Sequence, residues 1–231
     1  MIKYVLIVAL SLSLFAYNNG LDAFKNKDYT KAFELFMDEA SAGDIKSQNS
    51  LSYMYFNGVG VKKNTQEGIY WITKASKNNN PVAQYDLAMM YLSGHNINKD
   101  SKKAFTLLEQ ASDNGYVDAK YNLALMYYKG ENTDMNVTKA AKLLDSAAQY
   151  GHKASLENVG RIYMQLLRYD EAAYWLEINA ATGDKTAYYL LGEIYCSQEK
   201  FDKAILWTKK SIEIGNLDAL KLWKNCDLEN H

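Results

Sequence analysis

The sequence predicts an all-α protein built as a solenoid of tandem antiparallel helix pairs. Proline is nearly absent, with Pro81 alone among 231 residues, and only 13 glycines occur, so few residues interrupt helices. Small and large apolar residues alternate at helical spacing. A tyrosine also recurs at steps of 36, 36, 36 and 32 residues, at Tyr55, Tyr91, Tyr127, Tyr163 and Tyr195. A fixed period of this size is typical of stacked helical repeats.

Three further registers keep the same spacing. Twelve residues before each tyrosine stands Gly43, Asn79, Gly115, Gly151 or Gly183. A small residue recurs downstream, at Gly68, Ala104, Ala140, Ala172 and Ala204. Three residues further on comes a large apolar residue, at Trp71, Leu107, Leu143, Trp175 and Trp207. We therefore predict five full repeats, each made of a first helix (helix A) and a second helix (helix B).

Residues 1–16 predict a short secretory signal. Lys3 precedes an apolar run over residues 4–15, and small residues follow at Ser13 and Ala16. The run is too short to cross a bilayer, which takes about 20 residues. We expect cleavage after Ala16, which places the protein in the periplasm or outside the cell, with no membrane span in the mature chain. A buried first helix is the alternative interpretation.

Residues 17–44 predict a partial first repeat. Its residues Gly20, Tyr29, Ala32 and Leu35 fall in register with Gly192, Phe201, Ala204 and Trp207 near the end of the chain. This register indicates that the repeat array begins directly after the predicted signal.

Five full repeats follow, with the bounds 45–80, 81–116, 117–152, 153–184 and 185–216. Helix A of the second repeat carries Ala83, Leu87, Met90 and Tyr91 at positions i, i+4, i+7 and i+8, which form one apolar stripe. The recurring tyrosines lie on this stripe, so we assign them to the core. The glycine or asparagine after each helix B predicts a left-handed C-terminal cap.

Residues 217–231 predict a single capping helix, over 217–225. Gly215 precedes it and Ala219 keeps the register of the earlier repeats. Lys221, Lys224 and Asn225 then make it polar, as expected for a terminal helix whose outer face has no neighbour.

The segment 58–76, GVGVKKNTQEGIYWITKAS, resembles the Sel1-like repeat, which is related to the tetratricopeptide repeat. The family pattern is matched at Gly58, Gly60, Val61, Asn64, Trp71 and Ala75. Gly68 departs from it, because the family usually has alanine there. The shorter segments 27–36 and 199–207 look more like tetratricopeptide repeats. The resemblance covers nearly all of the mature chain and implies a right-handed superhelix that serves as a protein-binding scaffold.

The resemblance also implies that helix A lines a concave face, where a protein or peptide partner would bind. Four rows of positions on helix A would line this groove, and they combine aromatic residues, methionine and amides. One row contains Ser50 and Asp86 beside the candidate amides. The candidate binding residues are Asn49, Tyr53, Phe56, Tyr85, Met89, Tyr121, Asn122, Tyr128, Asn158, Arg161 and Tyr189.

Two interpretations of these rows remain open. In the first, Asn122 and Asn158 pair with the backbone of a bound peptide, and Arg161 binds a carboxylate. In the second, the row that contains Tyr85, Tyr121 and Tyr189 is buried between neighbouring A helices.

The two cysteines, Cys196 and Cys226, both lie in the last sixth of the chain. An even number of cysteines in an exported protein permits one disulfide, which would fasten the C-terminal end. Two free buried thiols are the equal alternative.

Residues 134–138, DMNVT, look like the extended acidic sequon used by some bacterial oligosaccharyltransferases, with Asn136 as the glycosylated residue. Helix capping by Asp134 or Asn136 is the favoured alternative, because helix B of the third full repeat begins here.

Composition and spacing argue against several other functions. The 26 basic and 27 acidic residues leave no basic surface for a nucleic acid. The three histidines, His95, His152 and His231, have no second metal ligand at helical spacing, and we expect no cofactor. His95 and His152 fall in predicted turns, where exposure is ordinary.

The favoured function is therefore a non-catalytic binding scaffold of the cell envelope or the secreted space. The alternative is β-lactam binding or weak hydrolysis, as in a cysteine-rich branch of secreted Sel1-like proteins; this chain lacks the cysteine pair that the branch carries in each repeat. A Ser-x-x-Lys motif, from Ser197 to Lys200, lies in a turn without the elements that accompany it in penicillin-interacting enzymes.

Overall fold

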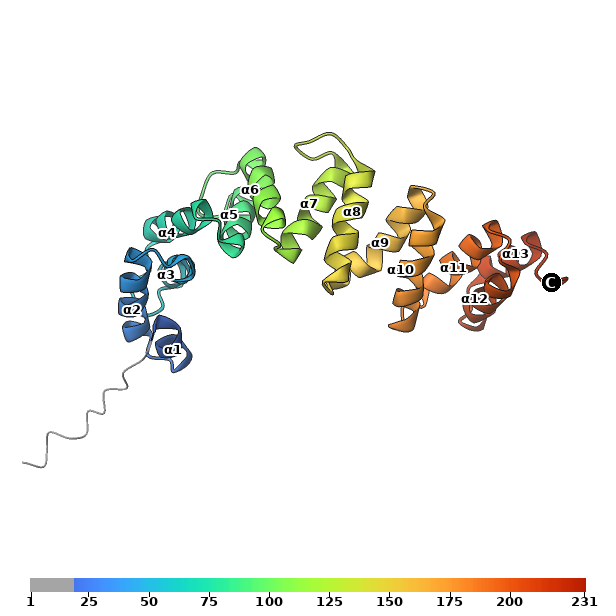
Figure 1. The fold of residues 1–231 in the computed structure, drawn as a ribbon, viewed down its shortest axis with the longest axis horizontal. Helices are drawn as coiled ribbons and strands as arrows, with labels where there is room; N and C mark the ends of the chain where they lie inside the picture. Colours follow the sequence, from blue (N-terminus) through green and yellow to red (C-terminus); the bar gives the residue numbers. More distant parts are fainter. Residues whose placement is uncertain (1–18) are drawn as a thin grey trace, which may run out of the picture. The chain divides into compact units, whose positions relative to one another are not determined.

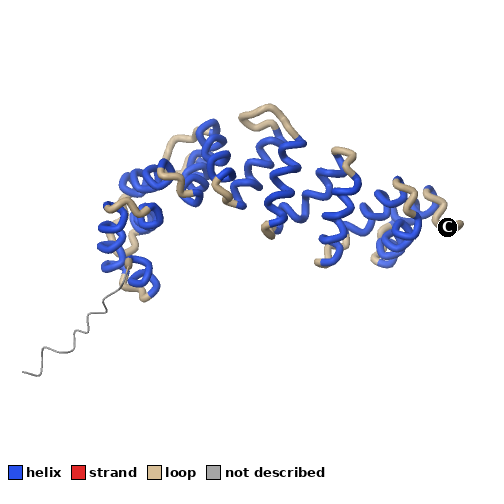
Figure 2. Tube along the Cα trace, in the orientation of Figure 1, coloured by secondary structure: helices blue, strands red, loops and turns tan. Residues whose placement is uncertain are grey.

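The structure, a computed structural model, describes residues 19–231, so the predicted signal over residues 1–16 lies outside the described residues. Within the described part, the chain forms helices joined by short loops and contains no strand (Figure 2). The predicted all-α solenoid of tandem helix pairs is therefore confirmed. No helix in residues 19–231 has the length and hydrophobicity needed to cross a membrane.

The described residues form thirteen helices (Figure 1). In unit 1 these are α1 (Gly20–Lys25), α2 (Tyr29–Ser41), α3 (Ile45–Asn57), α4 (Thr65–Lys77) and α5 (Pro81–Ser93). In unit 2 they are α6 (Ser101–Asp113), α7 (Val117–Lys129), α8 (Val137–Gln149), α9 (Lys153–Gln165), α10 (Tyr169–Ala181), α11 (Thr186–Ser197), α12 (Phe201–Glu213) and α13 (Leu217–Asn225).

The two units are compact bodies that divide the chain at residue 100, and each is described by itself. Within unit 1, each helix packs against the next along the chain, from α1 to α5. Within unit 2 the same holds from α6 to α13, and α13 also contacts α11. In both units an odd-numbered helix is a helix A, and the even-numbered helix that follows is a helix B.

The helix ends follow from local sequence. The Oδ1 atoms of Asn80 and Asn136 accept hydrogen bonds from the third helical amide, at 3.0 and 2.8 Å, and so cap α5 and α8. At the other end, the residue predicted to stop each helix B has a positive φ, from +62° at Asn79 to +101° at Gly43. These backbone conformations favour glycine or asparagine, which explains why those residues recur there.

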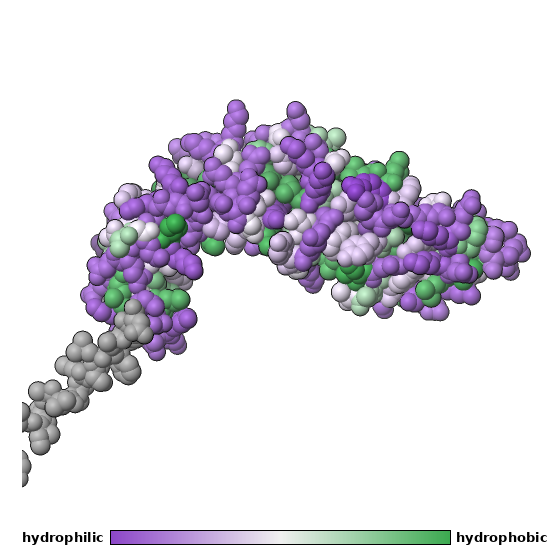
Figure 3. All heavy atoms as spheres, in the orientation of Figure 1, coloured by the Kyte–Doolittle hydropathy of each residue, from purple (hydrophilic) through white to green (hydrophobic). Residues whose placement is uncertain are grey.

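The interior of each unit consists of small residues that allow close approach of helices, with branched residues between them. The recurring small residues of helix B, Ala104, Ala140, Ala172 and Ala204, are fully buried. The most deeply buried large residue lies one position later than the predicted register, at Leu108, Leu144 and Leu176. On the face shown in Figure 3, hydrophilic residues dominate and hydrophobic residues form separate patches.

The recurring tyrosines differ between the units. Tyr127, Tyr163 and Tyr195 of unit 2 are buried, with exposed fractions of 7%, 3% and 3%. Tyr55 and Tyr91 of unit 1 are only partly buried, so their assignment to the core holds less strictly.

Each buried tyrosine hydroxyl in unit 2 donates a hydrogen bond to a carboxylate 18 residues earlier, on the preceding helix B. The acceptors are Glu109 at 3.1 Å, Asp145 at 2.5 Å and Glu177 at 2.7 Å. A cation from the following repeat half stacks on each ring, 4.7 to 5.0 Å from its centroid: Lys139, Arg168 and Lys203. The sequence analysis missed these groups, although a carboxylate 18 residues before the tyrosine was a readable signal.

Candidate functional site

An apolar cavity of about 500 Å³ lies within unit 1, and all five helices of that unit contribute to its wall. The floor includes Phe36 of α2, which is 4% exposed. The rim includes Leu21 of α1 and Tyr53 of α3, which are 51% and 52% exposed. Phe24, Phe56 and Ile72 complete the apolar lining. A cavity of this size and composition is typical of sites that bind part of a ligand or a partner's side chain.

Edge-to-face contacts between aromatic rings hold the wall. The ring centroid of Phe24 lies 6.2 Å from that of Tyr53, at an interplanar angle of 70°. It lies 6.4 Å from the ring of Phe36. Rings in such arrangements stabilise one another beyond the area that they bury, so α1, α2 and α3 present a preformed surface to the cavity.

A glycine on α4 makes room for another wall residue. A Cβ atom built on Gly68 would lie 2.6 Å from the Cδ1 and Cε1 atoms of Phe56. The ring of Phe56 therefore lies directly on the backbone of α4. This contact explains why Gly68 departs from the alanine of the repeat pattern, because an alanine would push Phe56 away from its place in the cavity lining.

Four polar residues also line the cavity: Asn49, Ser50, Asn57 and Asp86. Two of them already use their donors within α3. The hydroxyl of Ser50 donates to the carbonyl of Lys46 at 3.1 Å, and Nδ2 of Asn57 donates to the carbonyl of Tyr53 at 2.9 Å. Within the described residues, the side chains of Asn49 and Asp86 have neither a hydrogen bond nor an ion pair.

The surroundings of Asp86, on α5, disfavour its charged form. The side chain is accessible to solvent, yet the neighbouring protein removes part of its hydration, and this desolvation raises the pKa of the carboxyl above its ordinary value. No opposite charge among the residues of the cavity wall offsets this effect. The carboxyl is therefore a hydrogen-bond acceptor that gains from a cationic partner.

The structure brings three of the predicted binding residues of unit 1 together, since Asn49, Tyr53 and Phe56 all line the cavity. Tyr85 and Met89 lie on α5, are partly buried and are not part of the lining. The sequence analysis missed the opposite walls, which come from Phe24, Phe36 and Ile72 on three other helices.

In unit 2, Tyr121 packs against a histidine rather than lying free. The ring centroids of Tyr121 and His152 are 4.6 Å apart. Nδ1 of His152 accepts a hydrogen bond from the amide of Ser155 at 3.1 Å and so caps α9. The side chain of His152 is 17% exposed, so the expectation of an ordinary exposed turn residue was wrong, because its capping role and the tyrosine ring hold it against the protein.

The other candidates of unit 2 already have partners or are partly buried. The amide groups of Asn122 and Asn158 donate to the carbonyls of Asp118 and Ala154 in their own helices, at 3.0 and 2.7 Å. A guanidinium nitrogen of Arg161 donates to the hydroxyl of Thr186 at 2.9 Å. Tyr189 is partly buried, and Tyr128 is 36% exposed.

Arg161 also lines a polar hollow of about 710 Å³ in unit 2, between α9, α10 and α11. Its charged residues have mixed signs: Lys153, Glu157, Arg161 and Asp184. Few apolar side chains line it, so it offers no anchor comparable to the aromatic cavity of unit 1.

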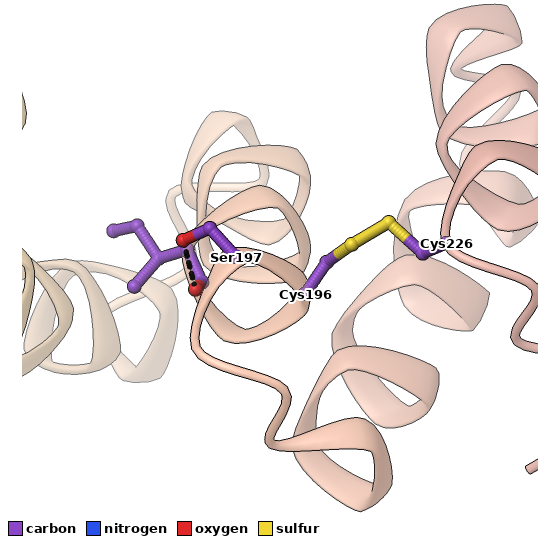
Figure 4. Close-up of a disulfide and its surroundings, with 4 residues drawn as sticks. Cys196, Ser197 and Cys226 are labelled. Atoms are coloured by element: carbon purple, nitrogen blue, oxygen red, sulfur yellow. Dashed lines mark hydrogen bonds between the residues drawn. A yellow bond between two sulfur atoms is a disulfide. The ribbon is translucent and has the colours of Figure 1, made fainter.

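Near the C-terminus, a disulfide joins Cys196 at the end of α11 to Cys226 directly after α13 (Figure 4). The neighbouring Ser197 hydroxyl donates to the carbonyl of Ile194 at 2.7 Å. The ammonium group of Lys200 lies 3.6 Å from a carboxylate oxygen of Asp170. The two ends of the Ser-x-x-Lys motif therefore have separate partners, and the structure does not assemble a serine with a lysine as its base.

Asn136 has the capping role that competed with glycosylation, since its Oδ1 accepts the amide of Lys139. Its modification stays a prediction. No cluster of three or more histidine, cysteine, aspartate or glutamate side chains suited to a metal ion occurs within residues 19–231.

Comparison with known proteins agrees with the fold. A family model described as the Sel1 repeat matches residues 9–36, 45–80, 81–116, 117–152 and 185–216. The chain is similar to the crystal structure of a Sel1 repeat protein from Oxalobacter formigenes, with 26% identity, a TM-score of 0.67, and coverage of 88% of this chain and 87% of that one. It is also similar to a protective antigen present in uropathogenic Escherichia coli strains, which displays an SLR fold, with 26% identity and a TM-score of 0.62.

The matched lengths differ among these relatives. The match to the antigen covers 87% of this chain but 45% of the antigen's chain. Over 41 residues, the chain is 46% identical to the putative sel1-like repeat-containing protein L18 of Acanthamoeba polyphaga mimivirus, and this match covers 18% of this chain and 7% of that protein. The chain thus spans only a small part of this curated relative.

Proposed function

This chain belongs to the Sel1 repeat family, and we propose that it is a non-catalytic scaffold that binds a protein or peptide segment through the cavity of α1–α5. The observation that carries the proposal is the cavity itself, with a buried aromatic floor and a rim formed by Leu21 and Tyr53, each about half exposed. Helix α3, a helix A, supplies most of the lining, in keeping with the face that the resemblance predicts for binding.

Physical reasons favour binding at this cavity over a merely structural role. Exposed apolar side chains gathered around a concavity lose contact with water when a partner covers them, and this burial stabilises the complex. Tyrosine is enriched among residues that dominate binding energy, because it buries a large area and loses little conformational freedom. Tyr53 combines these properties with a fixed orientation against Phe24.

We place the scaffold in the cell envelope or the secreted space. The signal pattern over residues 1–16 supports this location, and so does the Cys196–Cys226 disulfide, because such bonds persist in oxidising compartments. The intact mass of the native protein checks the location: it should correspond to a chain that lacks residues 1–16 and contains one disulfide.

Tyr53→Ala combined with Asn49→Ala should abolish partner capture. The change removes the exposed aromatic rim and the unpaired amide of the cavity, and it leaves the buried floor intact. The measurement is affinity capture from an envelope extract of the native cells, with the wild-type protein and the variant immobilised in equal amounts. We expect at least tenfold less partner on the variant, since a central tyrosine often contributes 2 kcal/mol or more.

The matched control is Tyr174→Ala on α10. Tyr174 is 59% exposed and contacts one neighbouring ring, that of Trp175, as Tyr53 contacts Phe24. This variant should capture the partner as the wild type does. Equal capture by the Tyr53/Asn49 variant and the wild type, with both folded by circular dichroism, would show that the cavity is not the binding site.

A further inference from the structure

The polar side of the cavity indicates the chemistry of its occupant. We propose that the bound segment carries a lysine or arginine beside a large apolar side chain, so that the apolar group fills the aromatic cavity while the cation pairs with Asp86. This inference rests on the proposed function and adds the specificity of that same site.

The hydrogen-bonding groups of the wall are mainly acceptors. Ser50 and Asn57 have their donors engaged with carbonyls of α3, so they present oxygen lone pairs to a ligand. Asp86 adds two carboxylate oxygens. A ligand that satisfies this set must bring donors, and the ammonium of lysine offers three N–H donors while the guanidinium of arginine offers five. Asn49 can both donate and accept, which suits a peptide backbone.

The charge of the wall points the same way. Asp86 is the one residue of the lining that carries a full charge, and the lining contains no lysine, arginine or histidine. An acidic segment would therefore meet repulsion without any compensating cation. A basic segment would form a charge-assisted hydrogen bond with a carboxylate that, within the described residues, has no other partner.

The two features belong to one site because the same cavity contains both. Tyr53 lies on the rim with its ring exposed, where a cation near Asp86 can also approach the ring face. The apolar floor alone would accept many hydrophobic segments. The unpaired carboxylate adds discrimination, because a segment that covers it without a donor would leave it desolvated and unpaired.

The test begins with a random twelve-residue peptide library displayed on phage and selected against the full-length protein. The enriched peptides should contain lysine or arginine within a few residues of an aromatic or long aliphatic residue. One enriched peptide is then synthesised with a fluorescent label, together with versions in which glutamine or glutamate replaces its basic residue. Fluorescence anisotropy measures their dissociation constants for the wild type and for Asp86→Asn, Tyr53→Ala and Asp38→Asn.

For the basic peptide, Asp86→Asn should raise the dissociation constant about tenfold, as expected for the loss of one charge-assisted hydrogen bond. The glutamine version should bind the wild type about as weakly as the basic peptide binds the variant, and Asp86→Asn should not weaken it further. Asp38→Asn, which removes an exposed acid of α2 outside the cavity, should change nothing. Unchanged melting temperatures show that the variants are folded.

The outcomes separate this inference from the proposed function. If peptides bind in a way that depends on Tyr53 but not on Asp86, or if acidic peptides are enriched, the site stands and the basic specificity is wrong. If Tyr53→Ala has no effect on any enriched peptide, both are wrong. Self-association of the protein that Tyr53→Ala abolishes, seen by light scattering, would instead assign the cavity to a second copy. Tighter binding of a peptide made from residues 1–18 would assign it to the chain's own first segment.

Discussion

The hydroxyl of Tyr163 is a polar group in the interior of unit 2, and its partner determines what it contributes. The residue is 3% exposed, and its hydroxyl donates to Asp145 at 2.5 Å. Burial and the neighbouring carboxylate raise the pKa of Tyr163 far above its ordinary value, because both disfavour the phenolate. The bond joins α9 to α8, so this single contact helps to hold successive repeats together.

Tyr163→Phe should lower the free energy of unfolding by about 2 kcal/mol. The ring and its packing remain, and the loss is that of a buried hydrogen bond to a charged group. Urea unfolding followed by circular dichroism measures the effect. Tyr174→Phe is the control, because Tyr174 is 59% exposed and should change stability by less than about 0.5 kcal/mol. Equal stability of Tyr163→Phe and the wild type would contradict a stabilising role for this bond.

Stability should also fall at alkaline pH. The pKa values of Tyr127, Tyr163 and Tyr195 are raised in the folded protein, primarily by burial and then by the carboxylate that each hydroxyl contacts. The contribution of each hydroxyl is therefore complete below the unfolded pKa of about 10 and is lost as pH rises through the folded value. The Tyr163→Phe variant should lose less stability above about pH 10 than the wild type does.

At the scale of elements, pairs of helices are matched through a few positions where size decides the fit. The contact of Phe56 on α3 with Gly68 on α4 is one such position. The equivalent positions of the next repeat are occupied by Leu92 and Ala104. A larger residue on helix A thus goes with a smaller one on helix B, and the exchange gives unit 1 an additional aromatic wall.

Gly68→Ala should destabilise the protein by about 1 kcal/mol, although alanine in a helix interior normally stabilises by that amount relative to glycine. The new methyl group would overlap the ring of Phe56, and overpacking of this kind costs about 1–3 kcal/mol. Adding Phe56→Leu should restore the stability, because that pair occurs in the next repeat. Thermal unfolding measures both variants, and a Gly68→Ala protein that melts above the wild type would show that the ring has free space.

The disulfide acts on the last elements of unit 2. It spans 30 residues of sequence and joins the end of α11 to the end of α13. A cross-link over a loop of this length stabilises by about 3–4 kcal/mol in the chain-entropy description. Without it, the short helix α13 is held by its packing against α11 and α12 alone.

Reduction with dithiothreitol should therefore lower the urea midpoint of the wild type, with early loss of α13 and α12. The double variant Cys196→Ser and Cys226→Ser should unfold at this lower midpoint whether or not the reductant is present. Identical unfolding of oxidised and reduced wild-type protein would mean that the bond adds no stability to this end of the chain.

For the whole molecule, sequence periodicity was sufficient to predict the fold. The small residues, the stop residues and Pro81 each follow from backbone and packing rules that act locally, so they identify the helices one after another. The Sel1 repeat matches share the predicted bounds 45–80, 81–116, 117–152 and 185–216. The first match, over residues 9–36, begins earlier than the predicted partial repeat.

The candidate site was predictable only in part. The pattern of α3 identified Asn49, Tyr53 and Phe56, because it showed which side of helix A is free of neighbouring helices. The opposite walls depend on tertiary packing: Phe24 reaches the cavity from a six-residue helix, and Phe36 from the following one. In unit 2 the same pattern selected Tyr121, whose ring packs on His152. A periodic pattern therefore locates a face, while the neighbouring side chains decide which part of it is open.

Site-specific photo-crosslinking tests the central claim most directly. Full-length protein with Tyr53 replaced by benzoylphenylalanine is irradiated with the selected peptide, in parallel with protein that carries the same group in place of Tyr174. The account predicts a covalent adduct from position 53, suppressed by excess unlabelled peptide, and none from position 174. An adduct from position 174 alone, or equal adducts from both positions, would contradict binding at the cavity of α1–α5.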